Sequence, residues 1–82
     1  MFKDTYEIYK IRDRATGEAH ERESRRQGHK IKIVALGTGY SMIYEYLEGG
    51  YLTTSTVENI EPNERELEVR TRNTIYTFKK SE

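Results

Sequence analysis

The stretch ELEVRTRNTIYTFKK, residues 66–80, decides the fold class of this 82-residue chain. Its first half alternates strictly, with Leu67, Val69 and Thr71 on one face and charged residues on the other. A period of two is typical of a strand that buries one of its faces. Asn73 tolerates a left-handed turn conformation, and a second run of apolar and β-branched residues follows it. The stretch therefore predicts two antiparallel strands joined by a tight turn.

The same period of two recurs along the rest of the chain, between short turn signals such as the Glu-Gly-Gly run at residues 48–50. Seven tyrosines and many β-branched residues favour strands, and helical periodicity is nearly absent. The expected fold is all-β, a small antiparallel barrel of six or seven short strands of Src-homology-3-like or OB-like size, with little or no helix. We expect a single domain over residues 1–82. The clearest strands are expected over residues 6–13, 30–36, 40–47, 51–57, 66–72 and 74–79.

Two of these strands carry signals beyond simple alternation. In the first strand, the apolar positions change phase between Ile8 and Ile11, which predicts a β-bulge near Tyr9. In the second strand, Val34 and Leu36 lie on the face opposite the other apolar residues. We therefore expect the end of that strand to be covered on both sides.

Residues 18–27, EAHERESRRQ, fit no single element. Two Glu/Arg pairs in this segment have the i,i+4 spacing of a helix. However, Ala19 is the only apolar residue, so a helix here would have no face to bury. We therefore expect an exposed or edge strand that runs into a basic loop, with a short helix as the alternative.

The composition limits the size of the core and the available chemistry. Hydrophobic and charged residues each make up 34% of the chain. We therefore expect one modest core and a net stability of about 5 kcal/mol. There is no cysteine, which excludes disulfides and thiolate zinc ligands. The first residues show no signal-peptide pattern, and the longest aliphatic run, residues 33–36, is far too short to span a membrane. We expect a soluble, cytoplasmic protein with no membrane partner.

Charge is sorted along the chain although the formal net charge is zero. Residues 1–32 hold nine Lys or Arg and six Asp or Glu, a net charge of +3. Residues 33–69 hold one Arg and seven Glu, a net charge of −6, and residues 70–82 return to +3 with four cations and one Glu. Charge blocks of this kind become faces of a compact domain, and faces select partners. If the first and last strands are neighbours, the two basic segments form one side of the barrel.

The spacing S-x-V-x-x-I at residues 55–60, followed by L-x-V-x-T-x-N-T-x-Y-x-F at residues 67–78, resembles the closing strands of certain small β-barrel proteins. Those proteins are mostly uncharacterised, and many belong to phages or mobile elements of Gram-positive bacteria. The likeness covers about a third of the chain, at its C-terminal end. It implies a barrel and a mobile-element origin, and it assigns no functional residue.

No set of residues has the spacing of a catalytic or cofactor site. His20 and His29 are the only histidines, and surface positions beside a basic loop explain them better than a metal site does. Ser24, His20 and Glu23 lie too close together in a charged segment to form a nucleophile and its base. Gly-Thr-Gly at residues 37–39 lacks the remaining signals of a phosphate-binding loop. We therefore expect no enzyme activity, no metal and no cofactor.

The basic segment provides one candidate site, for nucleic acid. A basic groove beside aromatic side chains is how small barrels bind single-stranded nucleic acid. The alternative is a solvated loop whose charges pair with nearby glutamates. Binding of single-stranded DNA or RNA is therefore our second hypothesis. Its candidate phosphate-binding residues are Arg22, Arg25, Arg26, Lys30 and Lys32.

The tyrosines provide the other candidate site, for a protein. Tyrosine combines a large apolar ring with a polar tip and is favoured at protein interfaces. Tyr44, Tyr46 and Tyr51 flank one expected hairpin, and the acidic rim beyond it includes Glu58 and Glu61. Our first hypothesis is a non-enzymatic interaction module that uses these residues to dock a protein partner or a second copy of itself. Which tyrosines are exposed decides between the two hypotheses.

Overall fold

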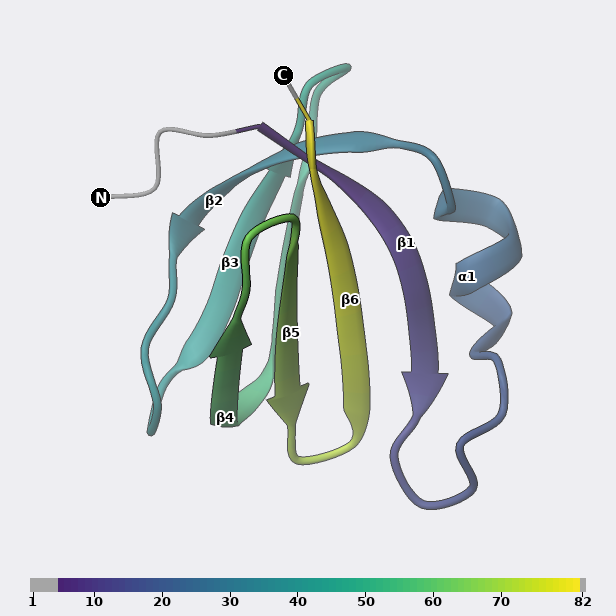
Figure 1. Ribbon diagram of the computed structural model, residues 1–82, viewed down its shortest axis with the longest axis vertical. Helices are drawn as coiled ribbons and strands as arrows, with labels where there is room; N and C mark the ends of the chain where they lie inside the picture. The colour runs from purple at the N-terminus through teal and green to yellow at the C-terminus, as the bar shows by residue number, and fades with distance from the viewer. Residues whose placement is uncertain (1–4, 82) are drawn as a thin grey trace.

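In the described part of the chain, six antiparallel strands close into a barrel in the order β1-β2-β3-β4-β5-β6, and β6 returns to pair with β1 (Figure 1). The computed structural model describes residues 5–81. This architecture confirms the expected all-β barrel. Residues 1–4 and 82 of the expected domain lie outside the described residues. The strands are β1 (Thr5–Asp13), β2 (Lys30–Ala35), β3 (Ser41–Tyr46), β4 (Tyr51–Pro62), β5 (Glu66–Thr71) and β6 (Thr74–Ser81), and one short helix, α1 (Glu21–Arg26), follows β1.

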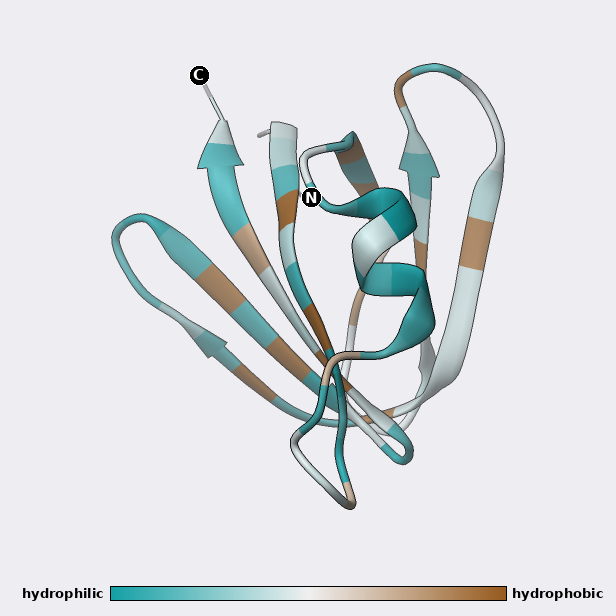
Figure 2. Cartoon of the chain, turned by 90° about the vertical axis from the view of Figure 1, so that its right-hand side faces the viewer, coloured by the Kyte–Doolittle hydropathy of each residue, from teal (hydrophilic) through white to brown (hydrophobic). Residues whose placement is uncertain are grey.

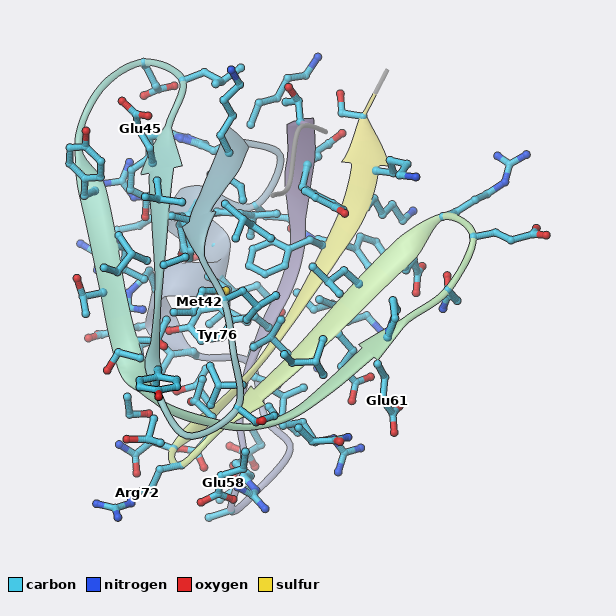
Figure 3. All side chains as sticks on the ribbon, turned by 90° about the vertical axis from the view of Figure 1, so that its left-hand side faces the viewer. Met42, Glu45, Glu58, Glu61, Arg72 and Tyr76 are labelled. Carbon is cyan, nitrogen blue, oxygen red and sulfur yellow. The ribbon has the colours of Figure 1, made fainter. Side chains whose placement is uncertain are left out.

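Alternation places one face of the strands inside the barrel. In β5 the expected inward residues Leu67 and Val69 are buried. Tyr44 of β3 belongs to a central aromatic cluster, and its ring centroid lies 5.6 Å from that of Phe78. Figure 3 shows Met42 pointing into the same interior. The other buried apolar residues are Tyr6, Ile8, Ile11, Ile31, Ile33, Tyr46, Val57 and Tyr76.

The pairing of β1 with β6 contains the expected bulge. The register shifts between Ile8 and Lys10, so Tyr9 is the extra residue of β1. The bulge changes the phase of the strand, and Ile8 and Ile11 are therefore both buried. β1 also pairs with β2, over residues 5–7. The first and last strands are thus neighbours, which is the condition for the two basic segments to meet.

β4 is longer than the sequence pattern predicts and joins the two halves of the barrel. The alternation predicts a strand that ends at residue 57, whereas β4 continues to Pro62. Its first part pairs with β3 and its last part pairs with β5, with a register shift between Val57 and Asn59. An irregularity of this kind interrupts the alternation, which is why the pattern ends early.

Residues 18–27 do not form the expected exposed strand, because residues 21–26 form α1. His20 caps the helix, and its Nδ1 accepts a hydrogen bond from the N–H of Arg22 at 3.0 Å. Glutamates in the first turn and arginines in the last turn complement the helix dipole. Figure 2 shows this helix, coloured mostly as hydrophilic, lying across one side of the barrel. The alternative of a short helix is therefore the correct one.

A buried carboxylate, rather than an apolar face, holds the helix in place. Glu23 is the buried residue of α1. It accepts hydrogen bonds from the backbone N–H of Ile11 at 3.0 Å and from Nε of Arg12 at 2.9 Å. A polar group can be buried when its hydrogen bonds are made in this way. The expectation of a strand was wrong because it counted only apolar residues as a face to bury.

Candidate interaction surface

The outer surface of β2, β3 and β4 is the candidate functional site. Alternate residues of a strand point to opposite faces, so the residues between the buried ones point outward. On β2 and β3 the buried residues are Ile31, Ile33, Met42, Tyr44 and Tyr46. The outward residues, which we call the outer β2–β4 face, are Lys32 and Val34 of β2, Ile43 and Glu45 of β3, Leu47 after β3, and Tyr51 of β4.

The backbone register makes this face continuous across three strands. Lys32 lies beside Glu45, and Glu45 lies beside Tyr51. In the next outward row, Ala35 lies beside the half-buried Ile43, and Val34 is the extra residue of β2 immediately before Ala35. Side chains that are cross-strand neighbours touch, with Cβ atoms about 5 Å apart. The outward residues therefore form one patch and are not scattered over the barrel.

The outer β2–β4 face holds apolar side chains that remain in contact with water. Val34, Leu47 and Tyr51 have 44%, 51% and 66% of their surface exposed. Tyr40, the other exposed large hydrophobic residue of the described chain, is 74% exposed and precedes the opposite end of β3. The expected cover on both sides of the strand end is wrong for Val34, whose side chain points to the outside of the ring of strands, whereas Leu36 is partly buried against the core.

Two of the three tyrosines expected at the interface are buried. Tyr44 has no exposed surface, and Tyr46 has 5%. They share the inward face of β3 with Met42, and of the three tyrosines Tyr51 alone points outward. Burial raises the pKa of Tyr44, and the neighbouring Tyr46 raises it further. The expected patch of three tyrosines is therefore wrong, and the residues that alternate with the two buried tyrosines form the surface instead.

The expected acidic partners of this patch, Glu58 and Glu61, lie elsewhere on the barrel. Both are exposed on the second half of β4, and Glu58 pairs with Arg14. Tyr51 begins the same 12-residue strand, and at about 3.3 Å per residue it lies roughly 23 Å from Glu58 along the chain. Figure 3 shows both glutamates well away from Glu45, which is part of the face. The two glutamates and Tyr51 therefore do not form one surface.

The cations expected to bind nucleic acid are divided between two roles. Arg22 donates a hydrogen bond from Nη1 to the hydroxyl of Tyr76 at 3.1 Å. The guanidinium of Arg26 lies 4.4 Å from the centre of the Tyr46 ring, a cation–π contact. Both arginines are half-buried and pack α1 against β6 and β3. The exposed members of the expected set are Arg25, Lys30 and Lys32.

Cations of both basic segments lie side by side on β1 and β6, but carboxylates lie among them. The ammonium of Lys79 is 3.9 Å from the centre of the Tyr9 ring, and that of Lys10 is 5.3 Å from it. In the sheet register, Lys79 lies between Glu7 of β1 and Glu66 of β5. The two basic segments therefore meet, and the adjacent glutamates lower the net charge of that side.

The residues with catalytic potential in the sequence have structural roles in α1. His20 and Glu23 cap and anchor the helix, and the hydroxyl of Ser24 donates to the backbone carbonyl of Glu21 at 3.3 Å. Within residues 5–81, no three His, Cys, Asp or Glu side chains are grouped as a metal site requires. No helix in the described part of the chain has the length and apolar character needed to cross a membrane.

Sequence reasoning missed Val34, Ile43 and Leu47 as surface residues. The signal for Ile43 and Leu47 lies in residues 42–47, MIYEYL, which are apolar on both faces apart from Glu45, and the signal for Val34 is its place between the inward Ile33 and Leu36 in the run IVAL. A strand in a one-layer barrel has one face in the core and one in water. A second apolar face on such a strand therefore indicates a binding surface.

Comparisons with known proteins identify no relative of this chain. The resemblance of residues 55–78 to phage barrel proteins stays a prediction. No family model matches this chain, and the curated proteins and the solved structures contain no match to it.

Proposed function

We propose that this protein is a non-enzymatic interaction module that docks a protein through the outer β2–β4 face. The observation that carries the proposal is the position of the exposed apolar side chains. Three of the four large ones in the described chain, Val34, Leu47 and Tyr51, lie on this face. Scattered surface hydrophobics need no explanation, whereas a continuous patch is typical of an interaction site.

The composition of the face fits a protein partner. Its apolar side chains are about half exposed, so a partner that covers them gains roughly 1 kcal/mol from each. Lys32 and Glu45 lie among them and supply polar contacts. An apolar patch interrupted by a few charged groups is typical of a protein interface.

The closed topology limits how a partner can bind. Each of the six strands is hydrogen-bonded to a neighbour on both sides in the sheet order. A partner strand therefore finds few free backbone groups for edge pairing. The partner would instead contact side chains on the outside of the barrel, as the proposed face requires.

The test is affinity capture with matched variants, using extract of the cells that encode the protein. The Leu47→Ser/Tyr51→Ser variant removes apolar surface from the face, and Tyr40→Ser removes the same kind of side chain at a similar exposure away from it. A specific partner should be retained by wild type and Tyr40→Ser and lost with the double variant. Equal retention by all three proteins would contradict the proposal.

The second candidate function is binding of single-stranded nucleic acid. The pairing of β1 with β6 supports it, because that pairing brings cations of both basic segments to one side. Arg25, Lys30 and Lys32 are the exposed cations of the original set. Three phosphate contacts give a slope of about −2 in a plot of log affinity against log salt. No binding to DNA or RNA oligomers at low salt would remove this candidate.

The proposal includes a cytoplasmic location and an origin in a phage or mobile element. The cysteine-free composition fits a reducing compartment. The resemblance of residues 55–78 supports the mobile-element origin.

A further inference from the structure

We infer that the protein docked on the outer β2–β4 face is a second copy of this chain, in a two-fold symmetric dimer. This inference rests on the proposed function, because it names the partner of the same face. A two-fold interface uses one patch on both copies, so the patch must be complementary to itself. The charges and apolar residues of the face meet that condition.

The charges at the centre of the face are complementary under a two-fold axis. Lys32 and Glu45 are direct neighbours in the β2–β3 register. Within residues 5–81 neither of them forms an ion pair, whereas Glu68 and Arg70 on β5 pair with each other at 2.8 Å. Lys32 and Glu45 therefore remain available to an external partner that presents the same two charges in reverse order.

The register defines how two copies would meet. A two-fold axis that runs along the strands, midway between β2 and β3, lays β3 of one copy over β2 of the other. Lys32 then faces Glu45 of the second copy, and Glu45 faces Lys32 of the second copy, because the two residues share one row. In the next outward row, Ala35 faces Ile43 of the second copy, and Val34, the extra residue of β2, lies just before Ala35. Each charged contact and each apolar contact is thus made twice.

The size of the face sets the expected strength of the dimer. With the axis between β2 and β3, these two strands of each copy overlap, and at a spacing of about 4.8 Å, with six residues at about 3.3 Å each, they cover roughly 10 by 20 Å. Such an area lies at or below the lower limit of stable interfaces. We therefore expect a weak dimer, with a dissociation constant between about 10 μM and several hundred μM.

The decisive experiment mixes two charge-reversal variants. The Lys32→Glu variant has a negative charge at both positions 32 and 45 of the face, and the Glu45→Lys variant has a positive charge at both positions. Like charges then meet twice in each homodimer, so the dissociation constant of each variant alone should rise about tenfold or more. An equimolar mixture has opposite charges at both contacts and should dimerise at least as tightly as wild type. Sedimentation velocity measures all three samples.

Mixing also separates contacts between copies from contacts within one chain. Lys32 and Glu45 are also neighbours within each chain, so each variant places like charges side by side there, and mixing does not relieve that internal repulsion. Glu68→Lys and Arg70→Glu are the matched controls, because they reverse an exposed pair on β5. They should leave the dissociation constant within about twofold of wild type. Circular dichroism should show the same fold in all variants.

Three results would overturn the inference. One is a wild type that stays monomeric at about 1 mM, and another is a mixture that stays as dissociated as its two components. The third is a β5 control that weakens the dimer as much as the face variants do. These three results would leave the proposed function standing, because they concern only the dimer. The proposed function fails if the Leu47→Ser/Tyr51→Ser variant retains every protein that wild type captures.

Discussion

Removal of the Glu23 carboxylate is expected to destabilise the protein more than other single changes on α1. In the Glu23→Ala variant, the fully buried Ile11 loses the acceptor of its backbone N–H, now 3.0 Å away. A buried donor without a partner costs about 1–3 kcal/mol. The contact with Arg12 adds roughly 0.5 kcal/mol, since that side chain is 39% exposed and the pair is screened by solvent.

The expected loss is therefore about 2–3 kcal/mol, which is about half of the roughly 5 kcal/mol expected for a domain of this size. At about 4–8 °C per kcal/mol, Tm should fall by roughly 10–20 °C. Urea denaturation followed by circular dichroism measures the free energy of unfolding, and a thermal scan measures Tm.

Two variants on the same helix serve as controls. Glu23→Gln keeps an oxygen acceptor for the N–H of Ile11 and loses the charge that faces Arg12, so it should cost only about 1 kcal/mol. Glu21→Gln changes an exposed residue and should stay within about 0.5 kcal/mol of wild type. A Glu23→Ala variant that also stays within about 0.5 kcal/mol would refute the reasoning.

Three further predictions concern the core and the turns. Above about pH 10 the fold should lose stability, because burial raises the pKa of Tyr44 above its ordinary value of 10.0, and the folded state then keeps a proton that the unfolded state releases. Urea midpoints between about pH 9 and 11 should fall less steeply for Tyr44→Phe, and equal slopes would contradict this. Gly49→Ala should cost about 1–2 kcal/mol, because Gly49 has a left-handed φ of 112°, whereas Gly37→Ala should cost less than about 0.5 kcal/mol. Equal unfolding free energies of these two variants would count against the backbone explanation. Thr71→Val should cost about 1–3 kcal/mol, because the buried hydroxyl donates to the carbonyl of Thr74 at 3.0 Å and accepts from its N–H at 3.1 Å. Thr71→Ser keeps both hydrogen bonds and should cost less, and a Thr71→Val variant within about 0.5 kcal/mol of wild type would contradict the role given to the hydroxyl.

Elements with local signals were predictable from the sequence. The alternation around Leu67 and Val69 identified a strand whose inward residues are buried as expected. The change of phase between Ile8 and Ile11 located the bulge in β1, because an extra residue shifts a period of two by one position. Each of these signals depends only on a few residues that are adjacent in the sequence, so it can be recognised without knowledge of tertiary contacts.

The helix α1 could not be predicted in the same way. Glu23 is compatible with burial only because the N–H of Ile11 and the guanidinium of Arg12 reach it. These partners precede it by 12 and 11 residues, across a turn whose path the local pattern does not define. In a charged segment, the sequence alone does not distinguish a carboxylate that becomes buried from one that stays exposed to water.

By itself, the sequence determined an all-β domain, most of its strands and the bulge in β1, because side-chain periodicity follows directly from backbone geometry. Tertiary structure alone decided which face of β3 lies inside. Alternation treats the two faces of a strand alike, and closure of the ring placed Tyr44 and Tyr46 in the core and Ile43 and Leu47 on the outside. That choice also decided which residues are free to bind a partner, and the function proposed for this protein depends on it.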